Sequence, residues 1–211
     1  MIRTTEQLRA LYDPVIPRAV LKQLDRLDAH CNRFIALSPF CVVSSAGTDG
    51  ALLDASPRGG ARGFAKITDA QTILLPDSGG NNRLDTLENL LRDSRIGLLF
   101  MIPGVDETLR INGNARLRDE PEFADQFAQE RQRPKLVIEV QVAEAYLHCA
   151  KAFMRSGLWQ PDSWQPRSEL PSMNQMLRDQ IGQPATQPVE PHDDMVARFR
   201  QLLADERKPG A

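Results

Sequence analysis

Residues 53–117 alternate short apolar segments with loops rich in Ser, Gly, Asn and Arg, and this pattern restricts the fold more than any other feature. Apolar segments at residues 64–67, 72–75, 96–102 and 108–117 have the length and composition of β-strands. These strands do not alternate regularly with long helices, so a doubly wound parallel sheet is not expected. The pattern favours a small, mostly antiparallel barrel with helices around it.

Further strands extend this block on both sides. Residues 40–45 and 51–55 have strand character, and Thr48-Asp49-Gly50 predicts a tight turn between them. Residues 136–147 alternate apolar and polar side chains over a long run, which is typical of a strand with one buried face. The sequence therefore predicts six or seven strands in one contiguous block.

Helices are expected at both ends of the chain and between some of the strands. Their predicted positions are residues 5–12, 17–32, 81–93, 121–131, 149–156, 172–181 and 193–206. Residues 183–191 contain three prolines and indicate a linker before the last helix.

Composition and charge limit the class of function. A net charge of −2 provides no basic field, so no nucleic-acid partner is expected. No segment approaches the roughly 20 apolar residues of a membrane-spanning helix, and the N-terminal residues lack the apolar core of a secretory signal. Cys31, Cys41 and Cys149 form no CxxC pair, which indicates a reducing compartment. We therefore expect a cytoplasmic protein without a membrane partner.

Two polar segments stand next to glycines. Ser56-Pro57-Arg58 precedes Gly59-Gly60, which is typical either of a backbone that approaches a flat ligand closely or of a wide surface loop. Asn81-Asn82-Arg83 opens a predicted helix, where free N–H groups, the helix dipole and a guanidinium suit a phosphate. The alternative for this second segment is an asparagine helix cap beside a solvent-facing arginine.

Arg110 and Asn112 form a third candidate group. If residues 108–117 are one strand, both side chains share a face, and Gly113 marks a bulge or a close ligand approach. If Asn112-Gly113 instead forms a two-residue hairpin turn, the segment divides into two short strands. The spacing leaves both interpretations open.

The segment after the last strand carries further candidates. Lys151 and Arg155 are four residues apart, so on a helix their side chains share one face. This face either binds a phosphate or is exposed to solvent. Trp159 follows in a loop rich in proline, where an interface or stacking role is typical. His30-Cys31 and His148-Cys149 lack the ligand spacing of a zinc site, so no metal site is expected.

The order of these motifs resembles the FMN-binding split-barrel superfamily, which is typified by pyridoxamine phosphate oxidase. The resemblance covers residues 34–159 and is greatest to the branch of FMN-dependent enzymes related to that oxidase. It rests on the segments LDASPRGG, GFAKI, LLPDSGGNNRLDTLENLL, RIGLLFMIPG and TLRINGNARL in this order.

The resemblance implies a mainly β protein with flanking helices (α+β). Its centre would be a six- to seven-stranded antiparallel split β-barrel that forms a dimer. The implied parts are an N-terminal helical segment (1–33), the FMN-binding barrel (34–160) and a C-terminal helical extension (161–211).

The same resemblance implies FMN as the cofactor, bound at the subunit interface of a homodimer. Ser56, Pro57 and Arg58 would line the isoalloxazine ring or the ribityl chain. Asn81, Asn82 and Arg83 would hold the phosphate, and Arg110 and Asn112 would lie on a strand beside the flavin. The partner subunit would contribute Lys151, Arg155 and Trp159.

The sequence also departs from true pyridoxamine phosphate oxidases. Their substrate-phosphate residues and their arginine-rich C-terminal motif have no counterpart, so FMN binding is implied more strongly than vitamin B6 oxidation. The leading hypothesis is an FMN-dependent oxidoreductase with an unassigned small-molecule substrate or electron donor. Because the flavin would carry the redox chemistry, no side chain is assigned a catalytic role. The alternatives are a non-catalytic carrier of flavin, deazaflavin or haem, with His30 or His148 as haem ligand, and a structural barrel with no ligand.

Overall fold

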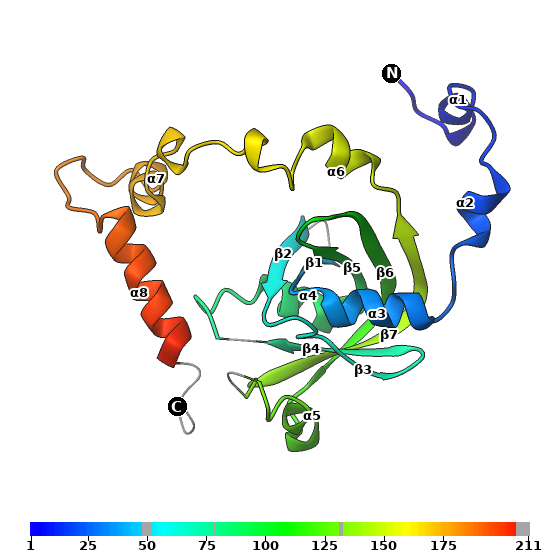
Figure 1. Cartoon of the computed structure of the whole chain (residues 1–211), viewed down its shortest axis with the longest axis horizontal. Helices are drawn as coiled ribbons and strands as arrows, with labels where there is room; N and C mark the ends of the chain where they lie inside the picture. The colour runs from blue at the N-terminus through cyan, green and yellow to red at the C-terminus, as the bar shows by residue number, and fades with distance from the viewer. Residues whose placement is uncertain (48–51, 78, 131–132, 206–211) are drawn as a thin grey trace.

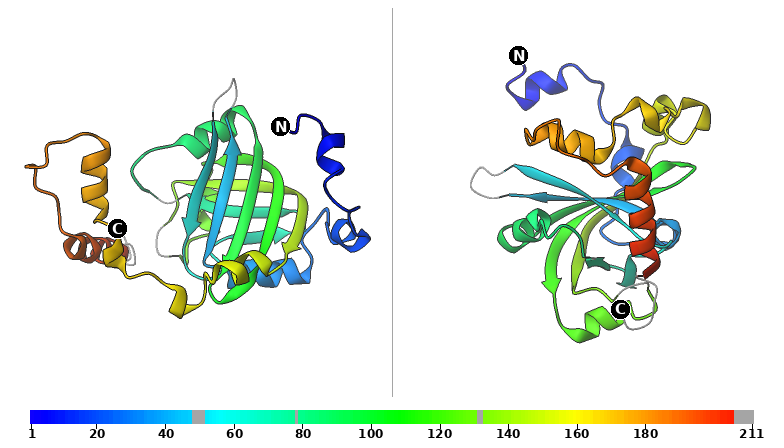
Figure 2. Two further views of the ribbon diagram at one scale, coloured as in Figure 1. Left: turned by 90° about the horizontal axis from the view of Figure 1, so that it is seen from above. Right: turned by 90° about the vertical axis from the view of Figure 1, so that its left-hand side faces the viewer.

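The computed structural model describes residues 1–47, 52–77, 79–130 and 133–205, and a single antiparallel sheet dominates them. The sheet has seven strands in the order β2-β1-β5-β6-β7-β4-β3. Their bounds are β1 Phe40–Ala46, β2 Leu53–Gly59, β3 Lys66–Asp69, β4 Thr72–Asp77, β5 Arg95–Ile102, β6 Val105–Arg118 and β7 Leu136–His148. The strands lie side by side in one strongly curved sheet (Figures 1 and 2). This confirms the predicted antiparallel barrel, while the predicted turn at residues 48–50 lies outside the described residues.

The core of the barrel follows from the alternation of side chains along the central strands. Val43, Leu98, Phe100, Leu109 and Ile111 are each no more than 1% exposed. They belong to one contiguous apolar cluster that spans β1, β5 and β6. Period-2 alternation therefore places one row of side chains inside the barrel and leaves the opposite row outside.

Eight α-helices and two short 3₁₀ segments accompany the sheet within the described residues. Their bounds are α1 Thr5–Arg9, α2 Pro17–Leu21, α3 Ala29–Leu37, α4 Asp85–Arg92, α5 Pro121–Asp125, α6 Lys151–Ser156, η1 Pro161–Ser163, η2 Arg167–Glu169, α7 Met173–Gln180 and α8 His192–Asp205.

The single helix predicted over residues 17–32 is wrong, because a sheet contact divides it into α2 and α3. Leu24 exchanges two backbone hydrogen bonds with Ala145 of β7, with N···O distances of 3.0 and 2.8 Å. Asp28 then caps α3 by accepting the N–H of Cys31 at 2.8 Å. The helix that follows buries Cys31 and Ile35 against the core.

Two segments of the sheet differ from their predicted form. Ser56-Pro57-Arg58 lies within β2 and not in a loop, and β2 is an edge strand, where a proline costs no ladder hydrogen bond. Residues 105–118 form one continuous strand with a register shift at Asn112/Gly113 on the side of β7. Gly113 therefore marks a bulge, as predicted, with the extra residue Ala143 on β7, and the hairpin alternative is wrong.

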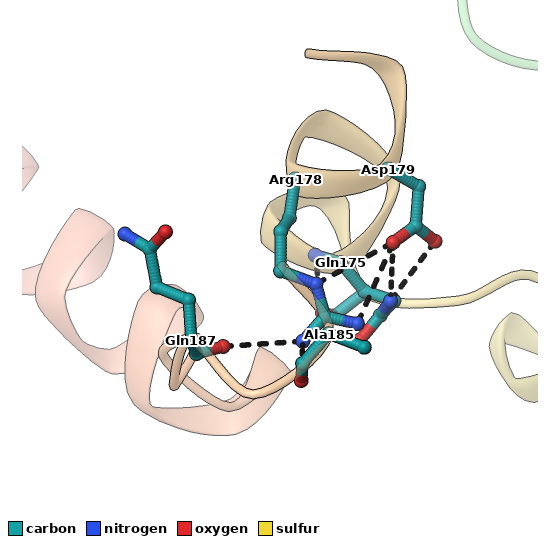
Figure 3. Close-up of polar contacts among 6 residues, drawn as sticks. Gln175, Arg178, Asp179, Ala185 and Gln187 are labelled. Atoms are coloured by element: carbon teal, nitrogen blue, oxygen red, sulfur yellow. Dashed lines mark hydrogen bonds and ion pairs between the residues drawn. The ribbon is translucent and has the colours of Figure 1, made fainter. Parts of the chain in front are cut away.

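The N-terminal helices α1 and α2 and the C-terminal helices α7 and α8 project from the barrel (Figure 2). At the C-terminal end, Arg178 of α7 donates hydrogen bonds to the main-chain oxygens of Ala185 and Gln187, with N···O distances of 3.1 and 3.2 Å (Figure 3). Glu190 pairs with Arg198 of α8 at 2.8 Å and accepts a hydrogen bond from Asn174 of α7. The predicted linker is thus held against the helices on both sides of it.

Candidate functional site

The strands around β1 present two different faces, which we call inner and outer. Directly paired residues of antiparallel strands share a face. On the inner face, Ser56 pairs with Val43 and Val43 with Leu98, both of which are buried. On the outer face, Ser44 pairs with Gly97 and Gly97 with Asn112. The candidate residues therefore fall into two groups on opposite sides of the same sheet.

On the inner face, Ser56 belongs to a polar network that connects β2 to α4. Its Oγ lies 2.9 Å from Asp54 Oδ2 and 2.8 Å from Thr86 Oγ1, and Thr86 also donates to Asp54. Next to this network, Asn89 Nδ2 donates to Ser45 Oγ at 3.1 Å. These bonds fix the helix that begins after the predicted phosphate segment.

Arg58 lies on the same face and forms an ion pair with Asp77 at the end of β4. The Nη1···Oδ1 distance is 2.6 Å, and the two side chains are 21% and 17% exposed. Arg58 Nε is buried and has no hydrogen-bond partner among the described residues. A cavity of about 220 Å³ lies beside it, between Pro57, Phe64 and Pro76. A buried guanidinium N–H without an acceptor is costly, so Arg58 is a candidate donor to an anionic group.

The segment before α4 is arranged differently from the predicted helix cap. Asn81 Oδ1 accepts the N–H of Arg83 at 2.9 Å, and Asn82 has a φ of 59°. The helix begins at Asp85, and Leu84 at the cap position provides no side-chain hydrogen bond, so the asparagine cap is wrong. The first N–H groups of α4 thus have no side-chain acceptor from the cap position, Leu84, and N–H groups of this kind can bind anions.

Arg83 itself points into solvent. Its side chain is 77% exposed and pairs with Asp85. A Cβ added to Gly79 or Gly80 would have no heavy atom within 4 Å. The segment therefore leaves space for a ligand beside Arg83.

The outer face is lined by small side chains near β1 and by polar ones near β7. One row across the strands contains Ala55, Ser44, Gly97 and Asn112, and a Cβ on Gly97 would lie 3.4 Å from Asn112 Oδ1. Cavities of about 770 and 520 Å³ lie along this face, and Ser44, Gly97 and Asn112 line both of them. Their size suits a small-molecule ligand or cofactor.

Polar side chains border this face on β6 and β7. Asn112 Nδ2 donates to Glu144 at 2.9 Å, and the guanidinium of Arg110 lies 5.8 Å from the centre of the Tyr146 ring. His148 packs against Tyr146 with ring centres 5.1 Å apart. Burial, then the nearby charges of Lys22 and Arg110, lower the pKa of His148. These effects favour the neutral form of the imidazole.

The residues predicted after β7 lie partly beside this face. Ala152 and Phe153 of α6 line the 520 Å³ cavity, and Phe153 stacks on Trp159 with ring centres 5.7 Å apart. Trp159 Nε1 donates to the main-chain oxygen of Val105 at 3.0 Å. Lys151 and Arg155 are exposed and form no ion pair within the described part of the chain. Both cations are thus available to a ligand or to another subunit.

The sequence-based interpretation missed several residues of this region. Asp54, Asp77 and Thr86 hold Ser56, Arg58 and α4 in place, and Tyr146 borders Arg110. The alternation of Asp54 with Ser56 could have indicated a strand with both side chains on one face. The glycines that follow favour a loop there instead. Thr86 and Asp77 carry no local signal, because their partners lie far away in the sequence.

Two features are absent from the described ranges. No three His, Cys, Asp or Glu side chains in them are grouped so as to bind one metal ion. None of their helices combines the length and the apolar character needed to cross a membrane.

This curved antiparallel sheet, with polar side chains and open cavities along one face, defines the chain as a split-barrel protein. The model of the pyridoxamine 5'-phosphate oxidase family matches residues 27–149, more than half of the chain. The chain belongs to the pyridoxamine 5'-phosphate oxidase family. The resemblance found in the motifs is thereby confirmed.

Comparison with other proteins adds distant structural similarities. A single-residue variant of HupZ from Group A Streptococcus is 17% identical with a TM-score of 0.46, over 57% of this chain and 98% of HupZ. An FMN-binding protein from Syntrophomonas wolfei is 10% identical with a TM-score of 0.42, over 55% of this chain and 81% of the other. General stress protein 26 from Bacillus anthracis is 9% identical with a TM-score of 0.41, over 55% and 88% of the respective chains. No protein with a curated description matches the sequence.

Proposed function

We propose that this protein binds FMN and acts as an FMN-dependent oxidoreductase. The observation that carries the proposal is the unpartnered, buried N–H of Arg58, a residue that lines a small cavity in a member of the pyridoxamine 5'-phosphate oxidase family. FMN combines a phosphate dianion with a flat, largely apolar ring system. A site for it needs cations and N–H donors at one end and a smooth wall at the other.

The phosphate end of the proposed site lies between β2, the end of β4 and the start of α4. Arg58 offers a buried N–H there, and Asn81, Asn82 and Arg83 lie on the open segment before the uncapped helix. Ser56 is hydrogen-bonded to Asp54 and Thr86, so it helps to position α4. Any contact of Ser56 with the ribityl chain of FMN would be a second role.

The ring end of the proposed site lies on the outer face. Ala55, Ser44 and Gly97 leave that part of the sheet nearly free of large side chains, and Pro57 lies on the same side of β2. Arg110 and Asn112 border this smooth area with donors. FMN would supply the hydride and electron transfer when bound, and the side chains would bind it, orient it and exclude water.

The opposite placement of the two groups supports a homodimer. Arg58 and Arg110 lie on different faces of one sheet. A single flavin contacts both faces most simply when one subunit supplies the inner-face residues and the other subunit supplies the outer-face residues. In this arrangement, Lys151, Arg155 and Trp159 of one subunit complete the flavin site of the other. The three free cysteines fit a reducing environment, and we place the protein in the cytoplasm.

Spectroscopy on the purified full chain tests the cofactor. We expect a two-band flavin spectrum, either as isolated or after addition of FMN. A colourless protein that does not bind FMN contradicts the proposal, and a Soret band would establish haem instead. Reduction by NADH or NADPH, followed by oxidation with a panel of acceptors, separates an enzyme from a flavin carrier.

A substitution tests the phosphate end. Arg83→Ala should weaken FMN binding by about 1–3 kcal/mol, because a charge-assisted hydrogen bond is lost. The control is Arg92→Ala at the other end of α4, which removes another exposed arginine, one that pairs with Glu88. FMN fluorescence titration should show a weaker affinity for the first variant only. Equal FMN affinities of the two variants would show that Arg83 is a surface arginine with no role in FMN binding.

A further inference from the structure

A separate cavity of about 780 Å³ lies where the N-terminal segment meets the end of β7. Its walls come from α2, from the start of α3, from residues 145–149 and from the first residue of α6. Ile16, Ala19 and Leu24 provide an apolar side. The hydrogen bonds between Leu24 and Ala145 hold the N-terminal segment at this place beside β7 (Figure 1). The cavity is therefore built by elements far apart in the sequence.

Positive charge dominates this cavity. Arg18, Lys22 and Lys151 line it, and none of them forms an ion pair with a described carboxylate. The one acidic residue of the lining is Asp28, whose Oδ1 already accepts the N–H of Cys31. Cations that converge on a cavity without carboxylate partners favour an anionic ligand.

An aromatic side chain completes the lining. Lys22 Nζ lies 5.3 Å from the centre of the Tyr146 ring and donates to the main-chain oxygen of Leu147 at 2.6 Å. His148 packs against the same ring, and the positive charge of Lys22 contributes to its lowered pKa. A ligand here would meet cations together with an aromatic and apolar surface.

The cavity also adjoins the outer face of the sheet. His148 and Cys149 line both this cavity and the 520 Å³ cavity that contains Arg110 and Asn112. A molecule bound in the first cavity would therefore lie next to the proposed position of the flavin. We propose that the cavity between α2 and β7 binds the substrate, a small organic anion with a carboxylate or phosphate group on an apolar body. The assignment as substrate rests on the proposed FMN-dependent function, whereas anion binding does not.

Calorimetric titration of the full chain tests anion binding. The probes are phenyl phosphate, benzoate and, as the neutral control, benzyl alcohol. We expect at least one anion to bind and the alcohol not to bind, and the ratio of the two anion affinities distinguishes phosphate from carboxylate. Failure of both anions to bind, or equal binding of the alcohol, overturns the proposal.

Charge-removing variants locate the site. Arg18→Gln combined with Lys22→Gln should weaken anion binding by about tenfold or more, because two unpaired cations are lost. The matched control is Arg3→Gln combined with Arg9→Gln, which removes the same charge from exposed positions near α1. The control should bind the anion within about twofold of the original chain. Equal weakening in both double variants would overturn the assignment to this cavity.

The substrate role has its own measurement. In the FMN-loaded protein, a saturating anion should shift the visible absorption of the flavin, because the two cavities share His148 and Cys149. Anion binding without a spectral shift overturns the substrate role and leaves the anion site in place. If the protein binds no FMN but still binds the anion, the proposed function fails and the anion site stands.

Discussion

The inner and outer faces of the strands around β1 use similar residue types for different purposes. On the inner face, Ser56 and Asn89 form hydrogen bonds that hold α4 on the sheet, and Arg58 pairs with Asp77 of β4. On the outer face, Arg110, Tyr146 and His148 lie beside cavities. A polar residue in a barrel of this kind therefore contributes to stability when the fold supplies its partner. It is available for binding when the fold leaves it open.

The largest expected effect comes from the core. Phe100→Ala should lower the free energy of unfolding by about 3–5 kcal/mol, because its fully buried ring leaves a cavity. The comparison is Leu99→Ala on the outer face, which should cost only about 1 kcal/mol in dilute protein. Urea unfolding at two protein concentrations measures both values. A cost for Leu99→Ala that grows with concentration would show that a second copy covers the outer face.

The bulge where Asn112 and Gly113 of β6 face β7 provides the next test. A Cβ on Gly113 would lie 2.1 Å from the main-chain oxygen of Gln141, so Gly113→Ala should cost about 3 kcal/mol. Gly79→Ala is the control, since a Cβ there meets no atom within 4 Å, and its effect should stay within about 0.5 kcal/mol. Thermal unfolding compares the two variants. A tolerated Gly113→Ala would mean that the two strands separate easily at the bulge.

Two arginines test the difference between the faces directly. Arg58→Met should cost about 2 kcal/mol, because Asp77 would remain mostly buried without its partner. Arg110→Met should change stability by less than about 0.5 kcal/mol, since Arg110 forms no ion pair among the described residues. Chemical unfolding of both variants decides the point. Equal losses would mean that Arg110 also has a structural partner in solution.

The smallest effect concerns the thiols. Burial raises the pKa of Cys31 to about 11 and that of Cys41 to about 12, whereas Cys149 is exposed. At about pH 8, roughly one in a thousand or fewer of the buried thiols is ionised, and only the thiolate reacts. We expect a disulfide reagent to modify Cys149 alone in the folded protein and all three cysteines in denaturant. Rapid modification of a second thiol would indicate that α3 separates from the sheet.

Much of the fold could be predicted because its strands carry local signals. The alternation of Leu109 and Ile111 marks β6, and the apolar run of β5 marks a central strand. The helix over residues 17–32 was wrong because helical spacing continues through Leu24, and only the pairing with Ala145 reveals the break. Pro57 and the glycines that follow it favoured a loop, since an edge position is not visible in sequence.

The candidate site could be predicted only in part, for a physical reason. The sequence shows which arginines and asparagines lie near the strands. It does not show whether each side chain lies on the inner or the outer face, because a shift of one residue in strand register exchanges the two faces. The network of Asp54 and Thr86 joins residues 32 positions apart, and Arg58 and Asp77 are 19 apart. Such partners follow from tertiary structure and have no signature in either local segment.

The attachment of the N-terminal segment to the barrel has a consequence for how related proteins could come to bind different small molecules. Helices α1 and α2 contain no buried residue, yet residues 16–22 form one wall of the 780 Å³ cavity. Substitutions there can alter ligand preference without altering the barrel interior, so stability and selectivity can change independently. Relatives with the same barrel could therefore acquire different small-molecule repertoires through an appendage that contributes nothing to the core.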